Sequence, residues 1–286
     1  MAHDELGIRM KEYYEHRSRH YLTRRMPVII RLDGKAFHTF TRGFRRPYDR
    51  VLHTAMQNTM KYLCDNIQGC KVGYTQSDEI TLLLTDYDTL QTDAWFGYNV
   101  QKMCSVAASM ATLAFNKEFE KAVQEYVFQW THGLTPQDVQ IQLEQQQYMS
   151  VLTNAVKKGA LFDARAFNIP KEEVVNCFIW RQQDATRNAI QMLGQAYFNH
   201  TELQGKSCSD IQEMLMTEKR INFNDMPTVF KRGTCCYKVT KPHTVVNISD
   251  ETEKVFDRSV WEIDTEIPIF TQDRNYIGRY VNIDQD

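Results

Sequence analysis

The chain has no long apolar segment. Of its 286 residues 42% are hydrophobic, and the longest weakly polar run, 104–115, is far too short to span a bilayer. Residues 1–7 lack the basic stretch followed by an apolar stretch that forms a secretory signal. These absences predict a soluble, cytoplasmic protein with no membrane partner.

The chain also lacks the residue spacings of several common sites. Its seven cysteines are an odd number, scattered mostly through helix-like segments, which argues against a disulfide framework. No Cys-x-x-Cys pair is present for zinc. Gly205-Lys206-Ser207 resembles only the end of a phosphate-binding loop, because His200 replaces the required glycine. We therefore expect free, mostly buried thiols, and a loop followed by a helix start at 205–207.

Acidic residues are scarce in one segment, although the formal net charge of the chain is only −2. Between Arg17 and Arg50 there are ten Lys or Arg residues and two acids, Asp33 and Asp49. A near-neutral protein with one strongly basic segment favours a polyphosphate or nucleic-acid partner.

Two apolar strand-like runs each end in an acidic turn. Residues 27–34 read Pro-Val-Ile-Ile-Arg-Leu-Asp-Gly, and residues 72–80 read Val-Gly-Tyr-Thr-Gln-Ser-Asp-Glu-Ile. Acidic residues are poor strand formers, so Asp33 and Asp78 are predicted to lie at a sheet edge. Taken singly, each motif is also typical of an ordinary turn or a helix cap. Their joint placement favours a site for divalent cations and phosphates.

The hydrophobic pattern up to residue 167 predicts the order β-α-β-β-α-β. The expected strands are 28–32, 72–75, 80–84 and 161–167, with a helix over 48–66 and helix-rich sequence over 94–130. This order is that of the split βαβ, or ferredoxin-like, arrangement. A right-handed crossover makes the first two strands parallel, with the third strand beside the first. Asp33 and Asp78 are therefore expected to meet at one edge of the sheet.

The remaining segments predict an α+β fold with added helices and a strand-containing C-terminal extension. Helical patterns cover 1–21, 170–181, 184–198 and 210–219, while 131–147 is a loop or a helical extension. Strand-like pieces lie at 235–239 and 281–283. We divide the chain into 1–135, 136–240 and 241–286, within one integrated domain.

Carboxylates at this edge suit a pair of Mg²⁺ ions that activate an attacking oxygen and stabilise a leaving phosphate. Gly34 permits close backbone approach, so that its carbonyl is a candidate ligand and the following N–H groups a phosphate cradle. Ser77 is a candidate hydrogen-bond donor to phosphate. Lys35, Arg31 and the basic cluster at 42–50 would neutralise triphosphate charge.

At this point the motifs show a resemblance to a known family. The segments 28–38, 43–44, 46–49, 74–79, 180–184, 222–224 and 231–234 occur in the order found in tRNA-His guanylyltransferases. These segments closely resemble that family, and the resemblance spans roughly residues 25 to 240.

The resemblance implies a palm-like domain, similar to that of polymerases and nucleotide cyclases, which adds nucleotides to the 5′ end of tRNA in the 3′-to-5′ direction. ATP and GTP are the implied nucleotide substrates, and a homotetramer is the implied assembly. Asp33, Asp78 and the Gly34 carbonyl would bind two Mg²⁺ ions, and Glu79 matches a carboxylate needed for activity. The residues implied to bind the nucleotide are Asp33, Gly34, Lys35, Ala36, Phe37, His38, Ser77, Asp78 and Lys102.

One stretch departs from the family. Where members that act on histidine tRNA carry a His-Ile-Asn-Asn type sequence, this chain has Thr186-Arg187-Asn188-Ala189. The missing histidine favours the guanylyltransferase-like branch, which repairs 5′-truncated tRNAs, over addition of one guanylate to histidine tRNA. Two other functions stay open, a palm-domain nucleotide cyclase acting on free nucleoside triphosphate and a non-catalytic tRNA-binding protein.

Overall fold

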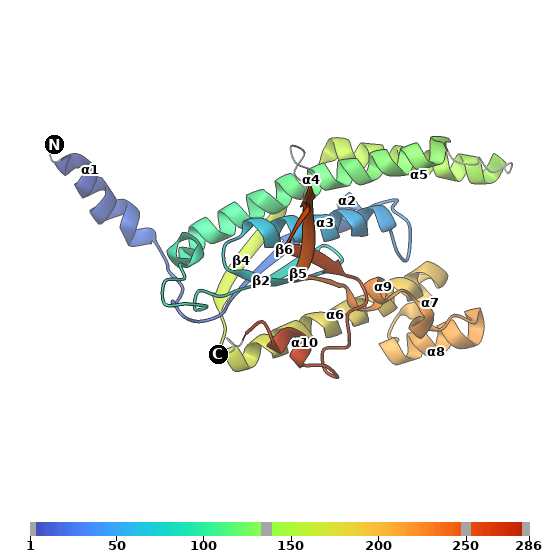
Figure 1. The fold of residues 1–286 in the computed structure, drawn as a ribbon. Helices are drawn as coiled ribbons and strands as arrows, with labels where there is room; N and C mark the ends of the chain where they lie inside the picture. The colour runs from blue at the N-terminus through green and yellow to red at the C-terminus, as the bar shows by residue number, and fades with distance from the viewer. Residues whose placement is uncertain (1–3, 133–138, 247–252, 282–286) are drawn as a thin grey trace.

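A six-stranded antiparallel sheet forms the centre of the molecule, with helices on both faces (Figure 1). The computed structural model describes residues 4–132, 139–246 and 253–281. The elements are α1 (Glu5–Met10), η1 (Lys11–Glu15), η2 (His16–Ser18), β1 (Val28–Gly34), α2 (Phe37–Phe40), α3 (Arg50–Asn66), β2 (Cys70–Gln76), β3 (Glu79–Leu84), η3 (Trp95–Tyr98), α4 (Val100–His132), α5 (Val139–Lys158), β4 (Phe162–Asn168), α6 (Lys171–Tyr197), α7 (His200–Leu203), α8 (Cys208–Lys219), η4 (Phe223–Asp225), α9 (Thr228–Arg232), β5 (Thr234–Val246), β6 (Glu253–Asp264) and α10 (Asn275–Gly278).

The strand order across the sheet is β4-β1-β3-β2-β5-β6. Both β1 and β2 pair antiparallel with β3, so β1 and β2 run parallel with β3 between them. The predicted order of strands and helices, and the predicted place of the third strand beside the first, are confirmed. The register sets Asp33 opposite Glu79 on one side and opposite Asp163 on the other.

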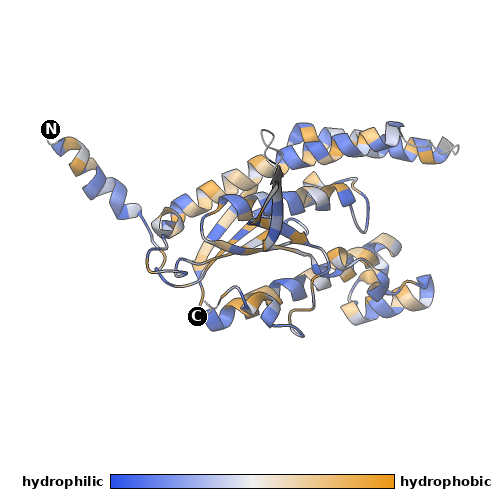
Figure 2. Cartoon of the chain, in the orientation of Figure 1, coloured by the Kyte–Doolittle hydropathy of each residue, from blue (hydrophilic) through white to orange (hydrophobic). Residues whose placement is uncertain are grey.

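Successive side chains of β1 point to opposite faces of the sheet and pack in two separate hydrophobic clusters. Val28, Ile30 and Leu32 are fully buried in a cluster with apolar residues of α3 and α4. Ile29 is 1% exposed and packs in a second cluster with residues of α6 and the C-terminal segment. Figure 2 shows the hydrophobic residues concentrated on the central strands and on the helix faces turned toward them. Because side chains alternate along a strand, this pattern also decides the face to which Asp33 belongs, which is that of Ile29.

A long helical hairpin covers one face of the sheet and extends beyond it. Figure 1 shows α4 and α5 running side by side past the end of the sheet, while α1 projects from the opposite end of the molecule. Residues 131–132 and α5 confirm a helical extension on the two sides of the undescribed residues 133–138.

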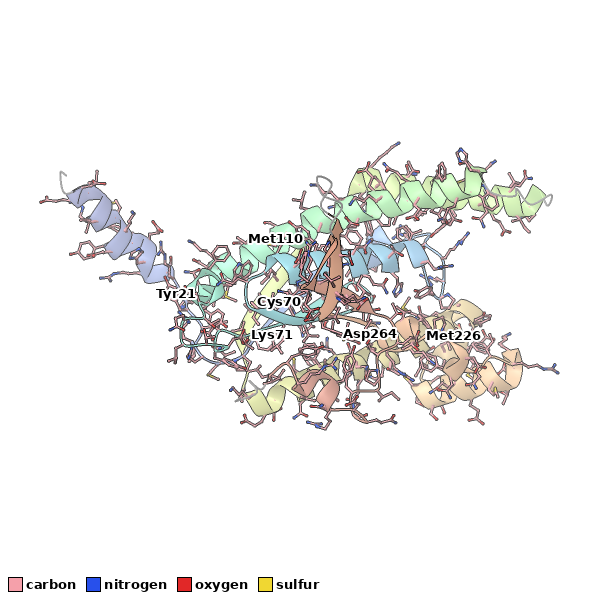
Figure 3. All side chains as sticks on the ribbon, viewed as in Figure 1. Tyr21, Cys70, Lys71, Met110, Met226 and Asp264 are labelled. Atoms are coloured by element: carbon pink, nitrogen blue, oxygen red, sulfur yellow. The ribbon has the colours of Figure 1, made fainter. Side chains whose placement is uncertain are left out.

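The C-terminal part adds two strands and a buried anchor. Asp264, labelled in Figure 3, lies at the end of β6 and accepts a hydrogen bond of 2.6 Å from the Tyr276 hydroxyl. The strand predicted at 235–239 is confirmed within β5, whereas β6 was not predicted. The strand predicted at 281–283 is wrong at Val281, which lies in a turn, and its other residues are outside the described part.

Two helix predictions need correction. The segments 170–181 and 184–198 form one continuous helix, α6, because neither glycine nor proline separates them. The N-terminal helix changes to π-helical geometry at Lys11 and ends at Ser18 instead of Tyr21. Tyr21, also labelled in Figure 3, instead forms a β-bridge with Asn99.

The cysteine expectation is confirmed. All seven cysteines are free, and five of them are buried. Within the described ranges, no helix is both long and apolar enough to cross a membrane.

Candidate active site

The two acidic turns meet at one end of β1. The Gly34 amide donates a hydrogen bond of 3.1 Å to the carbonyl oxygen of Asp78. Asp33 directly precedes Gly34, and the turn that carries Ser77 and Asp78 joins β2 to β3. The predicted convergence of Asp33 and Asp78 therefore follows from strand pairing, although 45 positions of sequence separate them.

The Asp78 carboxyl is mostly buried and lies near the carboxylates of Asp33 and Glu79. Burial raises the pKa of the Asp78 carboxyl, the Ser77 hydroxyl lowers it through a hydrogen bond, and the negative charges of Asp33 and Glu79 raise it further. The Ser77 Oγ lies 3.0 Å from Asp78 Oδ1. A cation at this position would relieve the repulsion between the carboxylates.

A row of three carboxylates crosses the sheet at this edge. Asp163, Asp33 and Glu79 occupy directly opposite positions on β4, β1 and β3. Like charges in such positions destabilise a sheet unless other groups compensate them. The Arg181 guanidinium lies 2.8 Å from Glu79 Oε2, and Arg165 lies 3.5 Å from Asp163. The sequence reasoning missed Asp163 and Arg181, because only the strand register and the packing of α6 place them here.

The segment that follows β1 is shaped by a glycine and a left-handed residue. A Cβ on Gly34 would lie 2.2 Å from the Phe37 ring, so only glycine lets that ring pack over the strand end. Ala36 has φ of 54°, which is uncommon for a residue other than glycine and occurs often at functional turns. The side chains of Lys35 and His38 are exposed. Phe37 is 5% exposed and belongs to the core, so only its backbone is available to a ligand.

A cavity of about 480 Å³ opens beside these turns. One wall consists of Gly34, 36–38 and the turn at 76–78, and the other of loop 44–49, the first turn of α3, and residues of α6 and α9. Ala189, the last position of the stretch that departs from the family, lines this cavity. The cavity thus joins segments from four separate regions of the sequence.

His53 lies at the α3 side of the cavity. Its ring stacks on Tyr48 with 4.2 Å between ring centroids, and burial lowers the pKa of His53 to about 4. The imidazole is therefore neutral near pH 7, with one donor and one acceptor nitrogen. Sequence reasoning missed His53 because it stands in an ordinary helical pattern.

The loop that precedes α3 is held by one buried acid. Asp49 is 4% exposed, caps α3 by accepting from the Leu52 amide at 3.0 Å, and accepts from the Arg45 amide at 3.0 Å. The Tyr148 hydroxyl of α5 donates to Asp49 at 2.6 Å. Asp49 consequently ties the cavity loop to the helical hairpin.

Lys102 is not brought together with the other predicted site residues. It lies in the first turn of α4, with its ammonium 5.8 Å from the Phe96 ring centroid. Phe115 of the same helix touches Phe37, and it lies thirteen positions along the helix from Lys102, which corresponds to about 20 Å. Within one chain, Lys102 therefore lies toward the opposite end of the sheet.

The basic segment has mixed roles. Arg24 and Arg25 bind Asp86, with 2.6 Å between Arg24 Nε and the carboxylate, and so stabilise the fold. Arg46 is exposed and lines the cavity. Only part of the basic segment is therefore available to a polyanion.

The residues at the sheet edge fit a magnesium site better than a zinc site. Among described residues there is no group of three or more His, Cys, Asp or Glu side chains arranged to hold a metal. Mg²⁺ is usually bound by one or two carboxylates, with water and substrate phosphates completing its six ligands. Asp33, Asp78 and the Gly34 carbonyl are oxygen donors of the type that such a site would use.

Comparison with known proteins identifies relatives along the whole chain. The family model described as tRNAHis guanylyltransferase matches residues 7–170, more than half of the chain. The structure of a bacterial tRNA(His) guanylyltransferase-like protein in complex with ATP is 40% identical, with a TM-score of 0.75, and the match covers 98% of this chain and 100% of that chain. A structure of such a bacterial protein in complex with GTP is 38% identical, with a TM-score of 0.72 and coverage of 97% and 99%.

The likeness extends to a curated protein of a named organism. The tRNA(His) guanylyltransferase of Debaryomyces hansenii is 28% identical over 222 residues, which cover 72% of this chain and 71% of that protein. The chain therefore belongs to the tRNAHis guanylyltransferase family, a family of nucleotidyltransferases.

Proposed function

We propose that this protein is a template-dependent 3′-to-5′ nucleotidyltransferase that adds nucleotides to the 5′ end of tRNA on a palm-like domain. The observation that carries the proposal is the pairing of β1 with the β2–β3 hairpin, which sets Asp33 and Asp78 side by side next to a cavity. Similar bacterial proteins form complexes with ATP and with GTP, which supports both as nucleotides for this chain.

The cavity suits a nucleoside triphosphate. The Gly34 and Lys35 amides already donate to the carbonyls of Asp78 and Leu161, so the N–H groups offered to a phosphate are those of 36–38, which begin at the left-handed Ala36. Successive amides around such a residue can form an anion-binding concavity. Arg46 adds exposed positive charge to the lining of the cavity, and the exposed Lys35 directly follows Gly34 in the sequence. Ser77 has φ of 52°, and its hydroxyl is directed at the Asp78 carboxylate.

Asp33, Asp78 and the Gly34 carbonyl would hold Mg²⁺. When bound there, the metal supplies activation of the attacking hydroxyl and neutralisation of charge on the phosphates. Glu79 keeps the row of carboxylates in place through its ion pair with Arg181. That pair leaves Asp33 and Asp78 as the acids without an Arg or Lys partner in the described structure.

We further infer that 5′-end repair is the preferred activity over single guanylate addition to histidine tRNA. The departing stretch lies on α6, where the Thr186 hydroxyl oxygen is 3.0 Å from the carbonyl oxygens of Gln182 and Lys231, which share its one proton. Ala189 lines the cavity. Thr186 therefore joins α6 to α9, and the small Ala189 side chain adds no hydrogen-bonding group to the wall. Because the stretch 186–189 contains no histidine, we infer that the enzyme selects the added nucleotide by base pairing with a template and does not recognise histidine tRNA specifically.

A 5′-addition assay tests the function. The protein is incubated with Mg²⁺, labelled nucleoside triphosphate, and tRNAs with and without a histidine anticodon, each intact or lacking the first nucleotide. We expect label at the 5′ end of truncated tRNAs of both kinds, and its loss in Asp33→Asn. Asp65→Asn, at an exposed position of α3, is the matched control and keeps activity. Cyclic product from nucleotide alone, or no label at the 5′ end with the parent, would contradict the proposal.

A homotetramer is part of the same proposal. Leu6, Tyr13 and Tyr14 of the projecting N-terminal helix are 59%, 56% and 67% exposed, which leaves apolar surface for another copy. Light scattering on the intact protein gives the mass directly, and a monomeric mass at micromolar concentration would contradict this part of the proposal.

A further inference from the structure

A second cavity adjoins the one at the acidic turns. Its volume is about 530 Å³, and it lies between the loop before α3 and the segment from the end of α6 through α7 to the start of α8. Arg46 and Gln195 line both cavities, so the two are adjacent, and we refer to them together as the groove. Figure 1 shows α7 and α8 beyond the C-terminal part of α6, at the end of the molecule where the α2–α3 loop lies.

The lining of this second cavity is cationic and rich in hydrogen-bond donors. Arg46, His200 and Lys206 are exposed, and no hydrogen bond or ion pair engages their side chains within the described part of the chain. The two acids nearest in sequence, Glu202 and Asp210, do not line the cavity. Glu202 accepts from the Asn199 amide at 2.7 Å, and Asp210 accepts from the Ser207 amide at 2.8 Å, while the charge of Lys206 contributes to lowering the pKa of Asp210. The lining itself therefore carries Arg46 and Lys206 without a carboxylate among them.

The volumes of the two cavities indicate that one nucleotide does not fill both. Binding sites for small ligands generally measure about 300–1,000 Å³, so the first cavity alone has room for one nucleoside triphosphate. The second cavity offers a comparable volume that this nucleotide does not need. A chain that reacts at Asp33 and Asp78 must leave the catalytic edge in some direction, and the groove past Arg46 provides a cationic path.

We propose that the second cavity binds backbone phosphates of the RNA substrate adjacent to its reacting 5′ end, with Lys206 and Arg46 as the cations and His200 and Gln195 as further polar contacts. This inference rests on the proposed function. Phosphates recognised in this way are a sequence-independent contact, in agreement with an enzyme that repairs more than one tRNA.

Lys206→Gln tests the inference, because Lys206 lines the second cavity and not the first. Lys61→Gln, at an exposed position of α3 outside both cavities, is the matched control. Binding of tRNA lacking its first nucleotide is measured by fluorescence anisotropy from 50 to 400 mM KCl. Binding of GTP is measured separately by calorimetry.

We expect Lys206→Gln to weaken tRNA binding about 3- to 10-fold at 100 mM salt and to reduce the slope of log affinity against log salt by about 0.7 to 0.9, one phosphate contact. GTP binding should match the parent. An unchanged affinity and slope, as in Lys61→Gln, would overturn the inference while leaving 5′-addition by the parent intact. Weakened GTP or ATP binding with unchanged tRNA binding would show that the cavity holds a second nucleotide instead. Absence of tRNA binding by the parent would refute the proposed function itself.

Discussion

His53 makes the stability of this protein depend on pH in a way that one substitution can isolate. Burial against Tyr48 and the cavity wall lowers the pKa of His53 from 6.5 to about 4, so the unfolded chain binds a proton more readily than the folded one. The neutral imidazole therefore costs no stability above pH 6.5, and stability is lost as the pH falls from 6.5 toward 4. At pH 5 these two pKa values make protonation of His53 favour the unfolded chain over the folded chain by a factor of about 30. This factor lowers the free energy of unfolding by about 2 kcal/mol.

Urea denaturation at pH 7.5 and pH 5.0 measures this loss. His53→Leu keeps an apolar side chain beside Tyr48 and cannot take up a proton. We expect the parent to lose about 2 kcal/mol more than His53→Leu between the two pH values. His20→Leu, which replaces an exposed histidine, should follow the parent.

The opposite result would refute the reasoning. If the parent and His53→Leu lose stability in parallel, the free energy of protonating His53 is the same in the folded and unfolded chains. That outcome would mean that water in the cavity solvates the imidazolium, and that stacking on Tyr48 does not exclude it.

Three further predictions concern the catalytic edge. Asp78→Asn should abolish 5′-addition yet raise the urea midpoint at pH 7.5, because it removes a carboxylate that neighbouring charges and burial disfavour; a lower midpoint would contradict this. Gly34→Ala should cost about 1–3 kcal/mol in unfolding free energy and weaken GTP binding, because its Cβ would lie 2.2 Å from a neighbouring phenylalanine ring. The control Gly278→Ala should be close to neutral, because its Cβ would have no neighbour closer than 3.7 Å. Arg181→Met should destabilise by about 2–4 kcal/mol by leaving Glu79 unpaired, and adding Glu79→Gln should recover part of that loss in thermal denaturation; equal stability of the single and double variants would refute the role given to the pair.

The central strands could be predicted because their residue types and their surroundings agree. Residues 28–32 are apolar except for Arg31, and Val28, Ile29 and Ile30 are β-branched. Both faces of β1 are covered, so local propensity and burial favour the same element. The edge strand β6 (Glu253–Asp264) has charged and apolar residues mostly in adjacent pairs instead of in alternation, and it pairs on one side only. Its sequence is weakly patterned, and only the partner strand β5 makes it a strand.

Some site residues could likewise be predicted from the sequence, and others could not. The meeting of Asp33 with Asp78 followed from topology, since strand order fixes which ends share an edge. Arg181 and His53 reach the site through the packing of α6 and α3, which no local pattern specifies. Lys102 was assigned because it matches a lysine of the family, and such a match carries no information on its distance from the other site residues within this chain.

The hydrogen bond from Tyr148 to Asp49 has a consequence for shortening this protein. The distal part of the α4–α5 hairpin extends past the sheet in Figure 1 and looks removable. Its returning helix nevertheless supplies the hydroxyl that completes the environment of Asp49, the residue at which α3 begins. A truncation that removes Tyr148 would leave a buried carboxylate with one donor fewer and would loosen the loop bearing Arg46. The shortest functional version of the chain must therefore retain the hairpin at least as far out as Tyr148.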